Sequence, residues 1–349
     1  MKKVLGIFRG FPGLGRVVSG VSLLETLRDQ YGCEIRMISY LQGNRYLESR
    51  GYVDLKEAVP MDYCSIGLVP TNKMGAFIHM TIKEFQPNVI VIDGEPLMIQ
   101  SIKISHANVK VVVLLNPADV DNPANDKEAM DFFNSLYSLA DIAIVHGLRT
   151  IAPLNQYRNY ISVGTIIRAE ILELLPKPKK NIYCLLGGGT VNVGHQFSES
   201  TIRIGELCLK LSAILSDYKM HIVCSSQNIY DALNENTIPP NTIMYNQILD
   251  STRYYMDACL IITRSGRNTL SEIAYLGIPA ISFVSGCTYR QYEQKQNIDC
   301  LANFNIVPAS LDINPDTLKE LCFQIIGRSF EKKKFVSGNQ KALETILSL

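Results

Sequence analysis

Short apolar runs alternate with stretches of helical periodicity along the whole chain. In the first half these runs include KKVLGIF, NVIVID and KVVVLL, each bounded by Gly, Pro, Asn or Asp residues. Helical patterns such as residues 18–30 and 126–139 lie between them. Apolar strands that alternate with helices indicate a parallel sheet covered on both faces.

The same pattern restarts after the segment LLPKPKKN, with the runs NIYCLLG, ACLIITR and PAISFV. A Pro-Lys segment cannot continue a helix and is typical of a linker. We therefore expect an α/β protein with two doubly wound, Rossmann-like parallel-sheet domains. The expected parts are an N-terminal domain over 1–165, a linker over 166–180, a C-terminal domain over 181–328 and a closing helix over 329–349. Ligands bind at the carboxyl ends of such strands, so an interdomain cleft is the expected site.

Composition narrows the class of protein. The 349 residues suit two domains, and 47% hydrophobic content supplies two cores. A formal net charge of +1 argues against a nucleic-acid partner. No apolar run is long enough for a membrane span, and the apolar part of MKKVLGIFRG is too short for a signal peptide. The nine scattered cysteines have no CxxC pair and indicate reduced thiols, so we expect a cytoplasmic protein.

Two glycine-rich loops follow predicted strands. The first, RGFPGLGRVV, lacks the GxGxxG spacing of a dinucleotide fingerprint. We expect Gly13 and Gly15 to let the backbone approach a bound substrate or donor, and a structural turn is an equally compatible alternative. The second, LLGGGTVNVG, has three consecutive glycines, which are entropically costly without a function. We expect the backbone N–H groups of Gly188, Gly189 and Thr190 to converge on a phosphate oxygen, with a flexible turn as the alternative.

The segment TRSGRNTLSEIAYLGIPAISF, residues 263–283, predicts a strand, a turn at Ser265 and Gly266, a helix ending at Gly277 and another strand. N–H groups at a helix N-terminus stabilise an anion. A carboxylate one turn into that helix, Glu272, would repel a phosphate but can accept hydrogen bonds from ribose hydroxyls. Phosphate and ribose together indicate a nucleotide. The simpler alternative is that Glu272 interacts favourably with the helix dipole.

The segment RSGRNTLSEIAYLGIPAI resembles the donor-nucleotide loop and helix of GT-B glycosyltransferases of family 28, which includes the UDP-N-acetylglucosamine transferase of peptidoglycan lipid II synthesis. The likeness covers most of residues 160–310. The matching residues in this loop and helix are Arg264, Ser265, Gly266, Thr269, Ser271, Glu272, Gly277 and Pro279.

The resemblance implies a role for several further residues. It places Gln247 and Ile248 at the uracil, Glu272 at the ribose, and Gln294 with the neighbouring Glu293 at the donor sugar. The residues that it places at the diphosphate are Arg168, Gly188, Gly189, Ser265 and Gly266.

The N-terminal half matches the family less well. The family's first loop ends in a histidine, and Arg16 stands at that position. Arginine cannot act as a base near neutral pH. The segment VIDGEPLM supplies Asp93 and Glu95 at a strand end, and related GT-B proteins carry a similar Asp-x-Glu-Pro segment. We expect one of these carboxylates to be the general base, and we count Arg16 with them as a catalytic candidate. A solvated turn with Asp93 as a cap is the alternative.

No metal or cofactor is expected. The segment DVD at 119–121 resembles a metal-binding motif of another transferase fold, but it lies in a Pro/Asn/Asp cluster that favours a loop. GT-B enzymes generally bind the diphosphate with protein groups. The segment 66–85 corresponds to a membrane-contacting patch in a family member, and a buried amphipathic helix is the favoured reading over weak peripheral membrane contact.

The resemblance implies transfer of a hexose or N-acetylhexosamine from a UDP-activated donor to an acceptor hydroxyl, with inversion. The acceptor stays open among small molecules, glycans and lipid-linked sugars. Three alternatives remain: a nucleotide-sugar hydrolase or an epimerase on the same scaffold, or a catalytically inactive nucleotide-sugar-binding subunit. The loss of the first-loop histidine makes the last of these conceivable.

Overall fold

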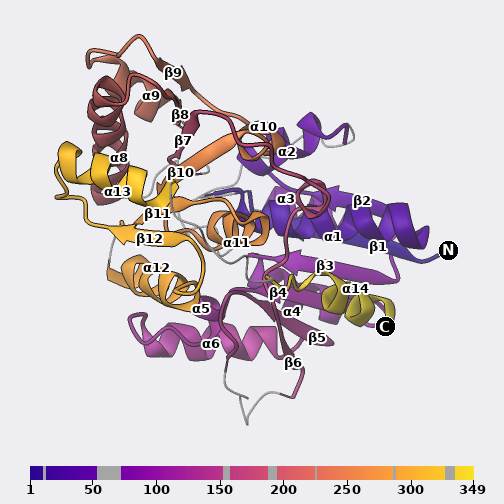
Figure 1. Ribbon diagram of the computed structural model, residues 1–349. Helices are drawn as coiled ribbons and strands as arrows, with labels where there is room; N and C mark the ends of the chain where they lie inside the picture. The colour runs from indigo at the N-terminus through magenta and orange to yellow at the C-terminus, as the bar shows by residue number, and fades with distance from the viewer. Residues whose placement is uncertain are drawn as a thin grey trace. The chain divides into compact units, whose positions relative to one another are not determined.

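The computed structural model divides into two compact units. Unit 1 comprises residues 1–169 and 337–349, and unit 2 comprises residues 170–336. In Figure 1 the yellow C-terminal helix lies among the indigo and magenta elements of unit 1. The structure describes residues 1–10, 13–52, 72–151, 158–187, 195–224, 226–285, 288–326 and 335–349.

Unit 1 contains a six-stranded sheet in the order β2-β1-β3-β4-β5-β6, in which neighbouring strands are parallel. The apolar runs of the sequence form these strands, and the interior side chains of β1, β3, β4 and β5 are almost fully buried. The strands are β1 (Lys3–Phe8), β2 (Glu34–Ile38), β3 (Val89–Asp93), β4 (Lys110–Leu115), β5 (Ile142–His146) and β6 (Tyr160–Val163).

Local sequence signals set the ends of several helices in unit 1. The first helix ends at Gly32, which has a φ of 65° that glycine adopts without strain. Pro96 begins another helix, where its missing N–H costs nothing. The helices are α1 (Gly15–Tyr31), α2 (Gln42–Ser49), α3 (Asn72–Phe85), α4 (Pro96–Ser105), α5 (Pro117–Val120), α6 (Lys127–Tyr137) and α14 (Asn339–Leu347). The short α7 (Ala169–Leu172) contains the division between the units.

Unit 2 contains a second parallel sheet of six strands in the order β12-β11-β10-β7-β8-β9. Its strands are β7 (Asn181–Leu185), β8 (Lys219–Val223), β9 (Thr242–Tyr245), β10 (Ala258–Arg264), β11 (Ala280–Phe283) and β12 (Ile306–Ala309). Its helices are α8 (His195–Ile214), α9 (Gln227–Asn234), α10 (Thr252–Tyr255), α11 (Arg267–Leu276), α12 (Thr288–Cys300) and α13 (Pro315–Ile326). The cysteines in the described ranges are free thiols, and four of them lie in the core of this unit.

Each sheet has a point at which the chain reverses its direction of travel across the strands. In unit 1 this point lies between β1 and β3, and in unit 2 it lies between β7 and β10. Ligands of open parallel sheets bind outside the carboxyl ends of the strands at such points. The predicted doubly wound, two-domain α/β fold is confirmed, and its topology indicates that ligands bind at the loops after these four strands.

Within the described ranges, no helix has the length and apolarity that a membrane span requires.

The C-terminal helix α14 is bound to unit 1 by a buried asparagine. The Asn339 amide accepts a hydrogen bond from the Ile167 N–H at 2.8 Å and donates one to the Ile167 carbonyl at 2.8 Å. The hydroxyl of Ser22, on α1, donates to the same carbonyl at 2.7 Å. The helix therefore satisfies backbone groups that lie more than 170 residues away along the chain.

We expect the Asn339→Ala substitution to lower the free energy of unfolding of unit 1 by about 2 kcal/mol, because it leaves the buried N–H and carbonyl groups of Ile167 with fewer partners. Urea denaturation measures this change. The control is Gln340→Ala on the exposed side of the same helix, for which we expect a change within about 0.5 kcal/mol. Equal denaturation midpoints for the two variants would contradict this role.

Candidate functional site

Charged and polar side chains of unit 1 gather where four of its strands end. Arg9 follows β1, Tyr40 follows β2, Asp93 ends β3 with Glu95 just beyond it, and Asp119 follows β4. The Arg9 N–H donates to the carbonyl of Asp93 at 2.8 Å, which joins the loops after β1 and β3. These groups lie at the point of unit 1 where an open sheet binds its ligand.

Arg16, at the start of α1, forms ion pairs with two carboxylates. Its Nη1 atom lies 2.6 Å from Oδ1 of Asp93, and its Nη2 atom lies 2.9 Å and 3.1 Å from the two carboxyl oxygens of Asp119. Burial acts to lower the pKa of Arg16, but the charges of Asp119 and Asp93 outweigh it and hold that pKa well above its ordinary value. Arg16 is thus a permanent cation that binds the ends of β3 and β4 to the first helix.

The acidic residues of the DVD segment are also engaged in ion pairs. Asp119 lies in α5 rather than in the predicted loop, where it accepts a hydrogen bond from the Asn116 N–H at 2.9 Å as part of a capping box. Asp121 pairs with Arg149 at 3.0 Å. Within the described residues, no group of three or more His, Cys, Asp or Glu side chains is arranged to hold a metal ion.

Glu95 differs from its neighbours because burial dominates its ionisation. Its side chain is 1% exposed, and the Tyr40 hydroxyl donates to its Oε1 atom at 2.6 Å. The Nε atom of Arg9 lies 3.7 Å from the same oxygen. Burial raises the pKa of Glu95, and the opposing effects of Arg9, Tyr40 and Arg16 do not cancel it. A carboxyl group with a raised pKa is suited to take up a proton near neutral pH.

Gly94 makes the close approach of the two arginines possible. Its φ of 89° lies in the left-handed region, which favours glycine. A Cβ atom at this position would lie 2.6 Å from Cβ of Arg9 and 2.7 Å from Cδ of Arg16. The Gly-Glu-Pro sequence therefore has three local functions: the glycine admits both arginine side chains, the glutamate is the N-cap residue of α4, and Pro96 begins that helix.

The structure brings the three catalytic candidates Arg16, Asp93 and Glu95 together in unit 1. Asp93 and Glu95 are 1% and 2% exposed, so the alternative of a solvated turn is wrong. Gly13 lies just before α1, and Gly15 is the first residue of that helix, next to Arg16. Sequence reasoning missed Tyr40 and Arg9, although both directly follow predicted strands, and that position is the signal that would have found them.

In unit 2 the glycine loop after β7 packs against the end of β10. Gly187 has a φ of 104°, and a Cβ atom there would lie 2.1 Å from Nη2 of Arg264. The Nη1 atom of Arg264 donates to the Thr201 hydroxyl of α8 at 3.3 Å. The two loops therefore meet at the point where unit 2 is expected to bind a ligand. Gly188, Gly189 and Thr190 fall outside the described residues.

The Ser265–Gly266 turn leads directly into α11, which begins at Arg267, immediately after the predicted turn. The Ser265 N–H donates to the Phe283 carbonyl at 3.0 Å, and its hydroxyl lies 2.6 Å from that of Ser282. Ser265 thus fixes the turn to β11. Gly266 is the exposed N-cap residue, and no side chain caps the helix. The N-terminal N–H groups of α11 have no partner within the helix.

Glu272 is 1% exposed and lies on α11. The Tyr255 hydroxyl of α10 donates to its Oε2 atom at 2.9 Å. The carboxyl group therefore connects α11 to α10, the helices that follow and precede β10 along the chain. Its predicted contact with ribose stays a prediction.

Two side chains of α12 shape the loops after β10 and β11. The Gln294 amide accepts from the Ser285 N–H and donates to the Ser285 carbonyl, both at 2.8 Å. The Asn297 amide donates to the Ser265 carbonyl at 3.2 Å. Gln294, which the resemblance places at the donor sugar, holds the loop after β11 in its shape.

The remaining predicted donor contacts differ in exposure. Thr269, Glu293 and Ile248 are partly buried, and Gln247 is exposed. Ile248 lines a cavity of about 400 Å³ together with Tyr183, Tyr245 and Thr252. Arg168 is buried in unit 1, so its predicted contact with a diphosphate held by unit 2 stays a prediction.

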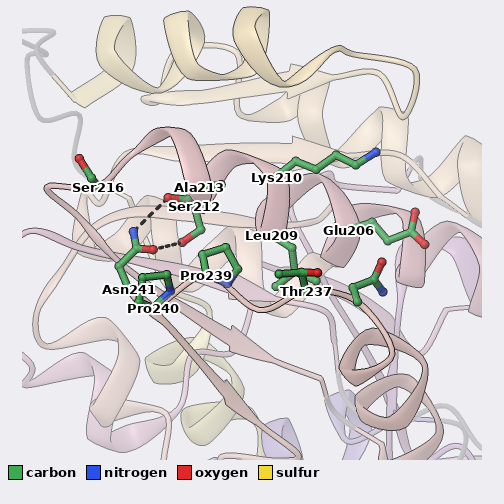
Figure 2. A pocket seen from close by; sticks show the side chains of 11 residues that line it. Glu206, Leu209, Lys210, Ser212, Ala213, Ser216, Thr237, Pro239, Pro240 and Asn241 are labelled. Carbon is green, nitrogen blue, oxygen red and sulfur yellow. Dashed lines mark hydrogen bonds between the residues drawn. The ribbon is translucent and has the colours of Figure 1, made fainter.

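A second cavity of unit 2, of about 590 Å³, lies between α8 and the loop that precedes β9. Figure 2 shows Asn241 in its wall, hydrogen-bonded to Ser212. Because this loop leads into β9, the cavity lies near the amino ends of the strands and away from the predicted donor loops.

The surroundings of Arg264 disfavour its positive charge. Burial lowers the pKa of Arg264 to about 9, and the like charge of Arg290 lowers it as well. The side chain is still charged at neutral pH. A bound anion would stabilise this charge, as would be expected at a phosphate site.

Comparison with known protein families identifies part of unit 2. Residues 194–321 match the glycosyltransferase family 28 C-terminal domain. The matched range contains the turn at Ser265 and Gly266 and the buried Glu272. The predicted resemblance to family 28 is confirmed for this range. No curated protein sequence matches the chain.

Solved structures resemble the whole chain. MurG of Acinetobacter baumannii has 14% identity and a TM-score of 0.57, with 100% of each chain covered. UGT89C1 of Arabidopsis thaliana complexed with UDP has 12% identity and a TM-score of 0.66, over 100% of this chain and 99% of the other. The UDP co-structure of S. aureus MnaA has 12% identity and a TM-score of 0.62, over 99% and 95%. At these identities the likeness establishes the GT-B fold.

We expect Arg16→Leu to lower the free energy of unfolding by roughly 3 kcal/mol, because it leaves the buried Asp93 carboxylate without its cation. Arg28→Leu, which removes an exposed pair with Asp29, is the control and should cost at most about 1 kcal/mol. Adding Asp93→Asn to Arg16→Leu should recover part of the loss. Urea denaturation measures all three variants, and equal losses for Arg16→Leu and Arg28→Leu would contradict the bridging role.

Proposed function

We propose that this GT-B protein transfers a sugar from a nucleotide-activated donor to an acceptor hydroxyl, because residues 194–321 match the C-terminal domain of glycosyltransferase family 28. The observation that carries the proposal is the position of the Ser265–Gly266 turn and Glu272, inside the matched domain and beside the end of β10. Unit 2 then binds the donor, and unit 1 binds the acceptor.

We propose UDP as the nucleotide. Two of the similar structures contain UDP, which supports a nucleotide site on this fold. Ile248 would contact the base beside its cavity, and Glu272 would accept hydrogen bonds from the ribose. The exposed Gly266 and the first turn of α11 would bind the diphosphate, and the charges of Arg264 and Arg290 favour an anion there.

The other predicted donor contacts belong to the same proposal. Gly188, Gly189, Thr190 and Arg168 would complete the diphosphate site, and Thr269 lies in the first turn of α11. Gln294 and Glu293 would face the sugar, a hexose or N-acetylhexosamine. The charged groups of the chain would stabilise the leaving diphosphate, so the proposal includes neither a metal nor a cofactor.

The proposed reaction is a single displacement at the anomeric carbon. The acceptor oxygen forms a bond to that carbon while the bond to the β-phosphate oxygen breaks, so UDP leaves and the configuration inverts. A carboxylate takes the acceptor's proton. Glu95 is better suited than Asp93, because Asp93 is ion-paired with Arg16 and the pKa of Glu95 is raised.

Arg16 has a structural role in this scheme. It stands where the family carries histidine, and its ion pairs with Asp93 and Asp119 fix the carboxyl ends of β3 and β4. Those strand ends hold Gly94 and Glu95 in place. Arg16 therefore supports the base without taking up a proton.

Three further points stay predictions: the cytoplasmic location, the class of acceptor, and weak membrane contact through residues 66–85. Residues 66–71 fall outside the described residues, and α3 forms the remainder of that segment.

A screen of UDP-hexoses and UDP-N-acetylhexosamines, with small-molecule, glycan and lipid-linked acceptors, tests the proposal. We expect release of UDP together with an acceptor heavier by one sugar in mass spectrometry. Free sugar formed without an acceptor would identify a hydrolase. Interconverted nucleotide sugar without UDP release would identify an epimerase, and binding without turnover would identify an inactive subunit.

We expect Glu95→Gln to lower kcat of transfer by a factor of about 10² to 10⁴, because the amide cannot take up the acceptor's proton. UDP affinity in calorimetry should not change, since Glu95 lies in unit 1. The control is Glu84→Gln, an exposed glutamate of α3 in the same unit, which should retain full activity. A Glu95→Gln variant with undiminished kcat would rule out this base.

Substitution of Glu272 by Gln should weaken UDP binding about tenfold, because the amide replaces a charged acceptor for the ribose hydroxyls. Isothermal titration calorimetry measures the affinity. Tyr255→Phe is the matched variant, since it removes the internal partner of Glu272 and leaves the carboxylate in place. Unchanged UDP affinity in Glu272→Gln would exclude the ribose contact.

A further inference from the structure

The two oxygens of the Glu95 carboxyl group have different surroundings. Oε1 accepts a hydrogen bond from the Tyr40 hydroxyl at 2.6 Å and lies 3.7 Å from Nε of Arg9. Oε2 is buried and has no hydrogen-bond partner within the part of the chain that the structure describes. Two neighbours therefore hold one oxygen, and the other is left to interact with a further group.

The buried Oε2 atom, which has no hydrogen bond to a described residue, lowers the stability of the folded protein. A buried polar atom without a hydrogen bond has lost its contact with water and gained no partner in exchange. The cost is smaller when the carboxyl group carries a proton, and burial favours that form. Tyr40 acts in the opposite direction, because its O–H donates to Oε1 and thereby stabilises the ionised carboxylate.

The position of Tyr40 is fixed by the loops that hold it. Tyr40 is 1% exposed. The neighbouring Ser39 hydroxyl donates to the Phe8 carbonyl at 2.8 Å, which ties the end of β2 to the end of β1. A Cβ atom at Gly10 would lie 1.8 Å from the Tyr40 carbonyl, so the loop after β1 packs directly on the Tyr40 backbone.

Arg9, the second neighbour of Oε1, is held by contacts with the Asp93–Gly94 turn. Its N–H donates to the Asp93 carbonyl, and its side chain passes the position that a Cβ atom of Gly94 would occupy. Its side chain is 14% exposed. The guanidinium is therefore kept beside Oε1 of Glu95 by the same turn that presents the carboxyl group.

We propose that Tyr40 and Arg9 are positioning residues, which fix Oε1 of Glu95 and leave Oε2 as the oxygen that accepts the acceptor's proton. This inference rests on the proposed transferase function and deepens it. In the proton transfer, the acceptor O–H bond breaks, an O–H bond forms at Oε2, and the electron pair of the acceptor oxygen forms the new bond to the anomeric carbon. Tyr40 and Arg9 exchange no proton.

The direction of the expected pH effect follows from the groups that face Glu95. Burial raises the pKa of Glu95, whereas Arg9, Tyr40 and Arg16 lower it. Without the Tyr40 hydroxyl the pKa of Glu95 rises further. The base must be ionised to act, so the acid limb of the pH profile should move to higher pH.

The test uses Tyr40→Phe in the full-length protein. We expect the acid limb of kcat/KM to move up by about one pH unit, and kcat at neutral pH to fall about tenfold, with the KM for the donor unchanged. The control is Tyr160→Phe, which removes a hydroxyl that bonds to Asn134 in the same unit and should leave the profile unchanged. A lower rate without a shift of the acid limb would indicate a merely structural role and overturn the proposal.

A second measurement does not depend on turnover. In protein labelled with ¹³C at the glutamate carboxyl carbons, the resonance missing from Glu95→Gln identifies Glu95, and its titration gives the pKa directly. Tyr40→Phe should raise that pKa by about one unit, and Tyr160→Phe should not change it. An unchanged Glu95 titration in Tyr40→Phe overturns the proposal. Absence of sugar transfer together with a shifted titration would contradict the transferase function and support the role of Tyr40 in setting the ionisation of Glu95.

Discussion

The ion pairs of Arg16 with Asp93 and Asp119 are the interaction on which the site in unit 1 depends. They join the start of the first helix to the carboxyl ends of two neighbouring strands. With that junction fixed, the Gly94 turn admits Arg9 and presents Glu95 at the N-cap of α4. The result is a pair of nearby carboxyl groups with different roles: Asp93 neutralised by a cation, and Glu95 governed by burial.

In unit 2 the loops of the candidate site are held mainly by backbone turns and hydrogen bonds, whereas in unit 1 they are held by ion pairs. Gly187 admits the Arg264 side chain, Ser265 fixes its own turn to β11, and Gln294 holds the loop after that strand. The helix N-terminus that follows is left without a side-chain cap. Such an arrangement suits a ligand that brings its own negative charge. The donor is thus proposed for the unit with backbone donors, and proton transfer for the unit with buried carboxylates.

Much of this could be predicted from the sequence. Uninterrupted apolar runs gave the parallel strands, and the residues around Gly266 and Gly277 gave the bounds of α11 to within one residue. The structure also brings together Arg16, Asp93 and Glu95, the catalytic candidates that the sequence indicated. The sequence could not predict which distant side chains contact each other. Arg16 pairs with Asp119, which lies 103 positions away along the chain, and Tyr40 bonds to Glu95, which lies 55 positions away. No local pattern encodes such contacts, and the hydrogen bonds by which Ser265 and Gln294 hold their loops were not predicted either.

Hydrogen exchange with and without UDP tests the central claim, a nucleotide site at the carboxyl ends of β7 and β10, most directly. The account predicts slower exchange on UDP addition in peptides that cover 264–277, with no change in peptides that cover the loop at 236–241 beside the cavity of Figure 2. Protection confined to the 236–241 loop, or no protection at 264–277 at saturating UDP, would contradict it.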